Sequence, residues 1–493
     1  MSDNSKKVLG LGGLVALVVG AMIGTGVFDL PKNMAEGAGG LAIIIAWVIT
    51  AIGMVALGYS FVNLSNRRPE LDGGVFSYAR AGFGEFWGFS NAWAYWLSAL
   101  LGNVTYAVAL LSAINYFMPK NIQLFHGAGP TILGIIVVSA VLWLVHILIL
   151  GGVKSATMVN VVVTIAKAIP LILFAICVVI FFHFDQFSAN FLGGLKTISW
   201  AVDVGKVPSI LNQVKSTMMA TVWSFIGIEG AVLFSSRARN KKDVGKATII
   251  GLLSVVFLYV IFTIGSLGVM SQADIGAIQS FPATAVILEH MVGSWGAAII
   301  NVGVIISIAG AWLAWTLFGA ETPYLAAQQG LFPAAFGKTN KRDTPVLSLV
   351  VSNVIVQVFL VLIYFAMDAY KFGYTMCSSA ILLPYAFSAF YQVKYMWQNK
   401  EIPKGRVVQI IIGVVASVYA LWLFYGAGLA YMAFTCLLFI PGVVIFIYDR
   451  IKQGNKIIMK AYEWVFAVAL CALGVYGLVA VLTNASLGLF SGF

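Results

Sequence analysis

The stretch Gly20-Ala21-Met22-Ile23-Gly24-Thr25-Gly26-Val27-Phe28 interrupts the first long apolar run of the chain. A second interruption, Trp223-Ser224-Phe225-Ile226-Gly227-Ile228-Glu229-Gly230, falls within a later apolar run. A helix in lipid cannot leave backbone N–H and C=O groups unpaired, so a broken membrane helix is tolerated only where it lines a cavity. Two such breaks in corresponding halves of a chain indicate the central binding site of a transporter.

The composition is that of a polytopic membrane protein. The 493 residues are 61% hydrophobic and 10% charged, whereas soluble domains carry about 25% charged residues. The apolar runs long enough to cross the bilayer are 9–28, 40–64, 86–117, 130–151, 153–182, 217–236, 246–270, 295–320, 344–367, 372–397, 407–425, 427–449 and 459–482. We therefore predict an all-α membrane protein with about 12 to 13 transmembrane helices.

The first ten predicted spans form two comparable blocks of five, and each block opens with an interrupted helix. An odd number of spans per block inverts the second block relative to the first, as in inverted-topology repeats. The predicted division is residues 1–183 for the first block, 184–216 for an extracytoplasmic connector, 217–397 for the second block and 398–493 for the last three spans. These last spans are uniformly apolar, which indicates a scaffold or the contact of a homodimer.

The net charge of +11 is explained by the distribution of lysine and arginine on the two sides of a membrane. With the N-terminus in the cytoplasm, most lysines and arginines fall on the cytoplasmic side, including the cluster from Arg237 to Lys246. This distribution follows the positive-inside rule and predicts a cytoplasmic N-terminus in the bacterial inner membrane. The basic excess therefore orients the chain in the lipid bilayer and does not indicate a nucleic-acid partner.

Several other classes of protein are disfavoured. The four cysteines lie in apolar runs without CxxC spacing, so neither a metal site nor a disulfide framework is predicted. The chain carries no GxxxxGK[ST] loop for ATP and no nucleophile–base constellation of an enzyme. No cofactor is predicted, and the energy for transport is expected from an ion or a counter-substrate.

Only two charged residues lie clearly inside the predicted spans and away from their ends, where each costs about 2.5–3.5 kcal/mol and usually serves function. Glu229 directly follows the second break and is expected to face the cavity. Lys167 belongs to Asn160-x-x-x-Thr164-x-x-Lys167-x-x-Pro170, whose members share one helix face. Its ammonium could replace a bound cation or change protonation during transport. A structural ion pair is the alternative for both residues.

The breaks also offer backbone groups to a ligand. Free N–H groups at Thr25 and Gly26 suit a carboxylate, because they lie at the positive end of a half-helix dipole. Unpaired carbonyls suit an ammonium group, so together the breaks predict an α-amino acid site. Close helix packing is the alternative use of the glycines. The backbone of this predicted substrate site comprises Met22, Ile23, Gly24, Thr25, Gly26, Trp223 and Ile226.

Tryptophans at mid-span can hold a cationic side chain, because a cation over an aromatic face gains about 0.5–2 kcal/mol. Trp223 lies in the second break and Trp315 lies on the eighth span, so we predict both as substrate contacts. Most tryptophans of membrane proteins instead anchor a helix at the interface or fill space between helices. Packing is our interpretation of Trp312.

The motifs as a set resemble the amino acid–polyamine–organocation superfamily, in particular its basic amino acid/polyamine antiporters. They are Gly20–Phe28, Pro69–Gly84, Tyr95-Trp96 with Gly102-Asn103, Trp223–Glu229 and Gly330–Pro333. The segment from Glu229 to Lys246 further resembles the bacterial arginine/ornithine antiporter branch. The resemblance implies a LeuT-type fold of five plus five inverted spans with discontinuous first and sixth helices.

The resemblance also implies roles for individual residues. The carboxylate would bind at Thr25 and Gly26, the span-six tryptophan would cap the substrate, and Trp315 would stack on a guanidinium. Asn103 matches a substrate-binding asparagine of span three. A cytoplasmic gate is implied at Tyr95, Glu229 and Tyr385. Lys167 resembles the span-five lysine of proton-coupled members, which arginine/agmatine relatives lack.

We therefore predict an antiporter that imports a cationic amino acid and exports its metabolic product, with arginine for ornithine as the first choice. Histidine/histamine, lysine/cadaverine and agmatine/putrescine exchange stay open, because few side-chain contacts decide among them. Proton-coupled symport through Lys167 is a rival within transport. A sensor that binds without translocating is a rival of another class.

Overall fold

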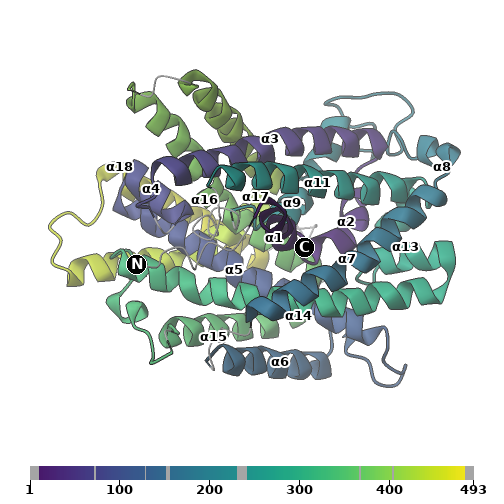
Figure 1. Ribbon diagram of the computed structural model, residues 1–493, viewed down its shortest axis with the longest axis horizontal. Helices are drawn as coiled ribbons and strands as arrows, with labels where there is room; N and C mark the ends of the chain where they lie inside the picture. Colours follow the sequence, from purple (N-terminus) through teal and green to yellow (C-terminus); the bar gives the residue numbers. More distant parts are fainter. Residues whose placement is uncertain are drawn as a thin grey trace. The chain divides into compact units, whose positions relative to one another are not determined.

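The structure is a computed structural model that describes residues 10–71, 74–127, 129–150, 156–229, 241–342, 344–365, 368–401 and 405–483. Its elements, drawn in Figure 1, are α1 (Leu11–Met22), α2 (Gly26–Ala35), α3 (Gly40–Arg67), α4 (Val75–Phe83), α5 (Glu85–Asn115), β1 (Phe125–His126), β2 (Gly129–Pro130), α6 (Ile132–Leu150), α7 (Ala156–Ile180), α8 (Phe184–Ala189), α9 (Ile210–Phe225), α11 (Lys241–Leu267), α12 (Gln272–Gly276), α13 (Ala283–Val292), α14 (Ser294–Gln328), η4 (Ala334–Gly337), α15 (Val346–Leu362), η5 (Ile363–Phe365), α16 (Ala369–Gln398), α17 (Arg406–Lys452) and α18 (Ala461–Thr483).

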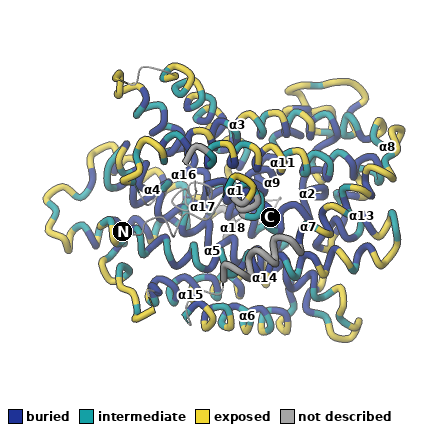
Figure 2. The backbone as a smooth tube through the Cα atoms, viewed as in Figure 1, coloured by how far each residue is buried: buried dark blue, intermediate teal, exposed yellow. Residues whose placement is uncertain are grey.

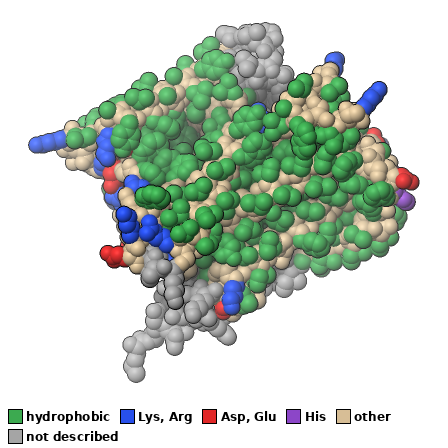
Figure 3. Space-filling model, turned by 90° about the horizontal axis from the view of Figure 1, so that it is seen from above, with side chains coloured by type: hydrophobic (Ala, Val, Ile, Leu, Met, Phe, Trp, Pro, Cys, Tyr) green, Lys and Arg blue, Asp and Glu red, His purple; other side chains and the backbone are tan. Residues whose placement is uncertain are grey.

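The architecture is that of an all-α membrane protein, as predicted. Among the described residues, nine helices are long and apolar enough to cross a membrane. In α5, 94% of the apolar window is buried, against 28% in α6, so α5 is an interior helix and α6 presents a lipid-compatible surface. Figure 2 shows this contrast, and Figure 3 shows a face dominated by hydrophobic side chains. Apolar surface on this scale fits contact with lipid acyl chains.

The first span consists of two half-helices. Helix α1 has 12 residues and α2 has 10, which correspond to rises of about 18 and 15 Å at about 1.5 Å per residue. Neither alone crosses about 30 Å of hydrocarbon, but together they do. The predicted interruption of this span is therefore confirmed, and residues 23–25 join the two halves.

Helix α9 begins earlier than the predicted start at residue 217. Ser209 caps it by accepting a hydrogen bond from the Asn212 backbone N–H, and Ile210 is buried. The polar side chains that suggested a loop are satisfied within the protein: the Gln213 carbonyl oxygen accepts from the backbone N–H of Gly39 at 2.9 Å. The connector predicted at 184–216 thus loses its last residues to the helix.

Helix α17 contains two predicted spans in succession. Its 47 residues would extend about 70 Å at the usual rise, more than twice the thickness of the hydrocarbon core. The backbone is non-helical only at Gly428, where φ is 75°. This kink replaces the connection predicted between 407–425 and 427–449, and glycine permits it because it has no Cβ to clash in the left-handed region.

Other boundaries also differ from the prediction. Helix α14 has 35 residues and continues past the predicted end at residue 320, so Glu321 lies within a membrane-length helix. Helices α4, α12 and α13 and the β1–β2 hairpin were not predicted, because these short elements lie between the long apolar runs. The end predicted for the sixth span, residue 236, lies outside the described residues.

The chain forms two compact units, and neither corresponds to a single predicted block. The first unit is Met1–Val62, Thr105–Val138 and Lys154–Trp312. The second unit is Asn63–Val104, Ser139–Val153 and Leu313–Phe493. The division into sequence blocks and their inverted relation stay predictions.

Helix α2 lies in the interior of the first unit. All ten of its residues are buried, and it packs against α9, α11, α12 and α13. Asp29 and Lys32 are among these buried residues. The prediction that only Glu229 and Lys167 are charged residues inside the spans was therefore wrong.

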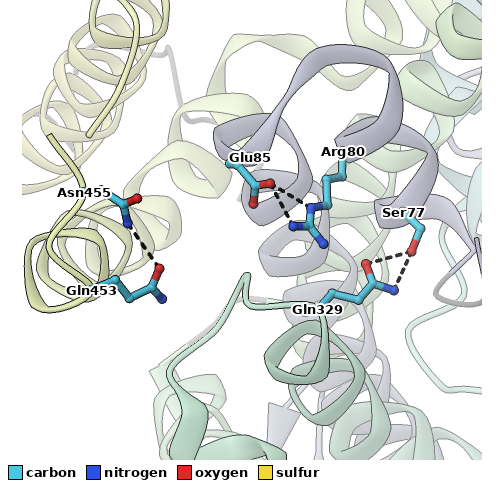
Figure 4. A network of polar contacts seen from close by, with 6 residues as sticks. All are labelled: Ser77, Arg80, Glu85, Gln329, Gln453 and Asn455. Atoms are coloured by element: carbon cyan, nitrogen blue, oxygen red, sulfur yellow. Dashed lines mark hydrogen bonds and ion pairs between the residues drawn. The ribbon is translucent and has the colours of Figure 1, made fainter. Parts of the chain in front are cut away.

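Helix α4 is fixed within the second unit by polar contacts, some of which are shown in Figure 4. Ser77 and Gln329 exchange hydrogen bonds of 2.8 and 3.0 Å between α4 and the segment that follows α14. Arg80 donates two hydrogen bonds to Glu85 at the start of α5. Lys394 of α16 donates to the Gly82 carbonyl at 2.5 Å. Together these contacts hold the short helix beside α16 and the end of α14.

Candidate functional site

The first break has the geometry of a half-helix start. Helix α1 ends at Met22, the next residue, Ile23, is extended, and Thr25 is the N-cap of α2. The first N–H groups of a helix have no intrahelical partners and point back along the axis. At Gly26 they therefore point toward the break, and that they bind a carboxylate stays a prediction.

Two glycines of the break allow close approach by aromatic side chains of the first unit. A Cβ on Gly26 would lie 2.9 Å from Trp223 Cδ1, and one on Gly24 would lie 2.8 Å from the Tyr106 hydroxyl. The rings of Tyr106 and Trp223 are themselves 5.8 Å apart. The predicted tryptophan of the second break therefore lies directly on the first break, together with a tyrosine that was not predicted.

The second break begins where it was predicted. Helix α9 ends at Phe225, Ile226 leaves the helical conformation, and Gly227 has φ of 108°. A left-handed φ of this size favours glycine. Glu229 is buried, and its carboxylate accepts a hydrogen bond from the Gly227 N–H at 3.2 Å. Gly230, the last residue of the predicted stretch, lies outside the described residues.

One tyrosine connects the two breaks. The Tyr259 hydroxyl, on α11, is 3.0 Å from the Ser224 carbonyl and 3.3 Å from the Met22 carbonyl. Its side chain is fully buried and packs against Trp47 and Phe225. A hydroxyl carries one proton, so it can donate fully to one of the two carbonyls at a time. Tyr259 thus partly satisfies the Met22 carbonyl, which belongs to the predicted substrate site.

Lys167 binds the backbone of the first break. Its ammonium donates to the Gly20 carbonyl at 2.7 Å and to the Ile23 carbonyl at 2.8 Å. The side chain is only 5% exposed. Carbonyl oxygens are also groups that ligate hard cations, but that the ammonium takes the place of a bound cation stays a prediction. The side chains of Asn160 and Thr164 lie outside the described residues.

Asn103 and Trp315 lie close together in the second unit. The Asn103 amide donates to the Ala99 carbonyl at 2.8 Å and accepts from the Thr316 hydroxyl at 3.1 Å. Trp315 lies against Gly102, where a Cβ would meet the indole at 3.0 Å. Helices α5 and α14 therefore place the predicted asparagine and the predicted stacking tryptophan side by side.

The predicted gate residues come from both units. Tyr385 is buried on α16 and Tyr95 is half-buried on α5, and both belong to the second unit. Glu229 belongs to the first unit. Because each unit is described by itself, the meeting of the three side chains stays a prediction.

Three residues near the breaks were not predicted from the sequence. Tyr106 and Tyr259 lie in long apolar helices, where tyrosine is common and no local pattern distinguishes a site residue. Asp29 did carry a signal, since an acidic residue three positions after Gly26 falls close to the first span. An intramembrane carboxylate is costly and should have been singled out.

These features define the class of protein. In an all-α membrane protein, the interrupted first helix meets the end of α9 through a shared tyrosine, and a buried lysine holds the backbone of the first break. Interrupted helices arranged in this way are the substrate and ion sites of membrane transporters. The chain is a multi-pass membrane transporter and not an enzyme.

Comparison with known proteins gives the family. The family model for amino acid permeases matches residues 9–470, and the chain belongs to that family. A Pseudomonas aeruginosa protein named arginine/ornithine antiporter is 41% identical over 100% of this chain and 99% of its own length. An Escherichia coli protein named putative arginine/ornithine antiporter is 41% identical over 93% of this chain and 96% of its own length. An arginine/agmatine antiporter of Chlamydia abortus is 38% identical, covering 92% and 93%. The family resemblance predicted from the motifs is confirmed.

Proposed function

We propose that this chain is an antiporter that exchanges arginine for ornithine across the bacterial inner membrane. The observation that carries the proposal is similarity over the whole length to relatives named for this exchange. The match covers nearly all of each relative, so the spans, both breaks and the connecting segments are included. The break geometry of the first unit supports an amino acid as the substrate.

In the proposed site, the α-carboxylate binds the N–H groups of Thr25 and Gly26, and the α-ammonium binds carbonyls of Met22, Trp223 and Ile226. The positive end of α2 favours the carboxylate. The Met22 carbonyl already accepts from Tyr259 at 3.3 Å, so binding of the ammonium would move that hydroxyl toward Ser224. Trp223 caps the substrate, while Asn103 and Trp315 contact its side chain.

Lys167 has the coupling role in this proposal. Its two hydrogen bonds to the Gly20 and Ile23 carbonyls hold the first break in one conformation. Losing them would free α1 to move relative to α2 and would loosen the backbone to which the substrate is proposed to bind. Tyr95, Glu229 and Tyr385 form the proposed cytoplasmic gate.

The proposed placement is a cytoplasmic N-terminus, supported by the positive-inside distribution of lysine and arginine. We also propose a homodimer formed by the last three spans. In this proposal the exposed apolar side chains of α18, whose apolar window is only 22% buried within one chain, pack against the second copy.

Counterflow in proteoliposomes tests the exchange. Vesicles preloaded with ornithine, agmatine, histamine, cadaverine or buffer receive labelled arginine, histidine or lysine outside. Ornithine inside is expected to accelerate arginine entry at least tenfold over buffer. The proposal is wrong if ornithine gives no acceleration.

The same panel separates the alternatives. Acceleration by agmatine and not by ornithine would favour the exchange named for the Chlamydia abortus relative. Arginine uptake driven by a pH gradient into vesicles without any counter-substrate would favour proton-coupled symport. Symport is retained as the alternative because the buried ammonium of Lys167, which binds the first break, could change protonation during transport.

A further inference from the structure

A buried carboxylate of α2 caps a helix from a distant part of the chain. The Asp29 carboxylate accepts a hydrogen bond of 2.9 Å from the backbone N–H of Ala283, the first residue of α13. The preceding residue, Pro282, offers no side chain that could cap α13. Asp29 is only 1% exposed. A carboxylate at a helix N-terminus satisfies an otherwise unpaired N–H group and interacts favourably with the helix dipole.

A second hydrogen bond runs in the opposite sense beside the first. The Thr284 hydroxyl, which is fully buried, donates to the Phe28 carbonyl at 2.8 Å. Two successive residues of α2 therefore bind two successive residues of α13, with one acceptor side chain and one donor side chain. We call this pair of bonds the α2–α13 clasp.

The clasp belongs to a larger cover over α2, formed by α12, α13 and the segment that joins them. At the other end of α2, the Gln272 amide donates to the Ala35 carbonyl at 3.1 Å. Gly276 lies against the backbone of Glu36, where a Cβ would come within 3.1 Å. The cover therefore contacts both ends of α2. Its Phe281 carbonyl also accepts a hydrogen bond from Ser112 of α5 at 2.8 Å.

The position of the clasp relates it to the break. Asp29 lies three residues after Gly26, so the clasp is about 4.5 Å along the helix axis from the first residue of α2, at 1.5 Å per residue. A force that moves the start of α2 therefore acts almost directly on α13. Apolar packing alone would let the two helices slide, whereas two directional hydrogen bonds in opposite senses fix their register.

We propose that Asp29 is a positioning residue that makes α13 move with α2, so that the cover follows the half-helix when substrate binds. The bond geometry is independent of the substrate's identity. Only the response to substrate rests on the proposed function.

Hydrogen–deuterium exchange on the full chain in lipid nanodiscs tests the clasp, first without substrate. Asp29→Ala is expected to speed exchange in the first turn of α13 roughly fivefold to tenfold, the size of a lost helix cap. Asp29→Asn keeps an acceptor oxygen and should stay within about twofold of the original chain. The matched control is Asp274→Asn. The Asp274 carboxylate belongs to the same cover but is exposed, and it accepts a hydrogen bond from Ser271.

The coupling is tested by adding saturating arginine. In the original chain, arginine should slow exchange in both α2 and α13. In Asp29→Ala it should slow exchange in α2 alone, and arginine–ornithine exchange should fall in Vmax with the dissociation constant of arginine unchanged within about twofold. If Asp29→Ala does not fold, Thr284→Val removes the other bond and should give the same pattern at about threefold.

Two results would overturn the inference. One is an unchanged exchange rate in α13 of substrate-free Asp29→Ala and Thr284→Val, which would mean that no clasp exists. The other is full arginine protection of α13 in these variants, which would mean that the clasp does not couple the helices. If arginine protected neither helix in the original chain, the proposed substrate would be wrong, and the substrate-free comparison would still decide the clasp.

Discussion

Replacing Lys167 tests whether its contacts with the first break are needed for transport. Methionine keeps most of the volume of the side chain and removes both hydrogen bonds, at 2.7 and 2.8 Å. A hydrogen bond from a charged donor contributes about 1.5–3 kcal/mol, so two contribute about 3–6 kcal/mol. Because every 1.4 kcal/mol is tenfold, the lower bound predicts that Lys167→Met loses at least about 100-fold of the exchange rate.

The assay is arginine entry into ornithine-loaded proteoliposomes, with equal amounts of protein confirmed in the vesicles. The thermal stability of the purified variant is measured alongside, so that an unfolded protein is not mistaken for an inactive one. Lys206→Ala is the control, because that lysine lies exposed in the segment between α8 and α9. It should exchange at the original rate.

A folded Lys167→Met that exchanges within about twofold of the original rate would refute this reasoning. The two carbonyls would then be satisfied by water or by substrate at no cost, and the lysine would be only a structural residue. A variant that still exchanges arginine for ornithine but loses a response to the pH gradient would instead assign the lysine to proton coupling alone.

Three further predictions concern the break and the segment between α8 and α9. Tyr259→Phe keeps the ring packing but removes the hydroxyl that donates to the break carbonyls, and a buried carbonyl without a donor costs about 1–3 kcal/mol. Exchange should therefore slow about tenfold. An unaltered rate would contradict the bridging role of Tyr259. Gly26→Ala places a Cβ 2.9 Å from Trp223, whereas Gly12→Ala meets nothing within 4 Å; arginine binding should weaken in the first and not in the second, as read by a scintillation proximity assay. Hydrogen bonds from the backbone N–H of Ser209 and the side chain of Asn212 lower the pKa of Asp203 below its usual value. The ionised carboxylate therefore stabilises the segment between α8 and α9 at any pH above the ordinary aspartate pKa. This stabilisation is lost as the pH falls through the lowered pKa of Asp203. Pepsin should therefore cut this segment faster relative to Asp203→Asn as pH falls from about 4 to 2, and a constant ratio would exclude the effect.

The positions of both breaks could be predicted from the sequence because their causes are local. Glycines at Gly24 and Gly26 interrupt an apolar run that is otherwise long enough to be one helix, and Gly227 needs a left-handed φ that favours glycine. The apolar runs 407–425 and 427–449 were predicted as separate spans, although no glycine was named between them, and the structure places the kink at Gly428. The apolar period and length of a segment are properties of neighbouring residues, so they can be read without the fold.

The partners of the breaks could not be predicted in the same way. Tyr259 and Tyr106 contact break residues that lie far before them in the chain. A tyrosine in an apolar helix has the same local pattern whether it packs in lipid or bridges two carbonyls. Only the pairing of α11 with α1 and α2 decides which of these Tyr259 does.

The ends of some helices also could not be predicted from the sequence. The start of α9 depends on a polar residue that leaves water only because a distant segment satisfies it, as the Gly39 N–H does for Gln213. The sequence by itself determined that this chain crosses a membrane many times and that α1 and α9 end at glycine-containing stretches, since hydrophobicity and backbone freedom are local. Only the tertiary structure decided which groups occupy those breaks and that Asp29 binds α13, because hydrogen bonds between distant segments exist only once the chain has folded.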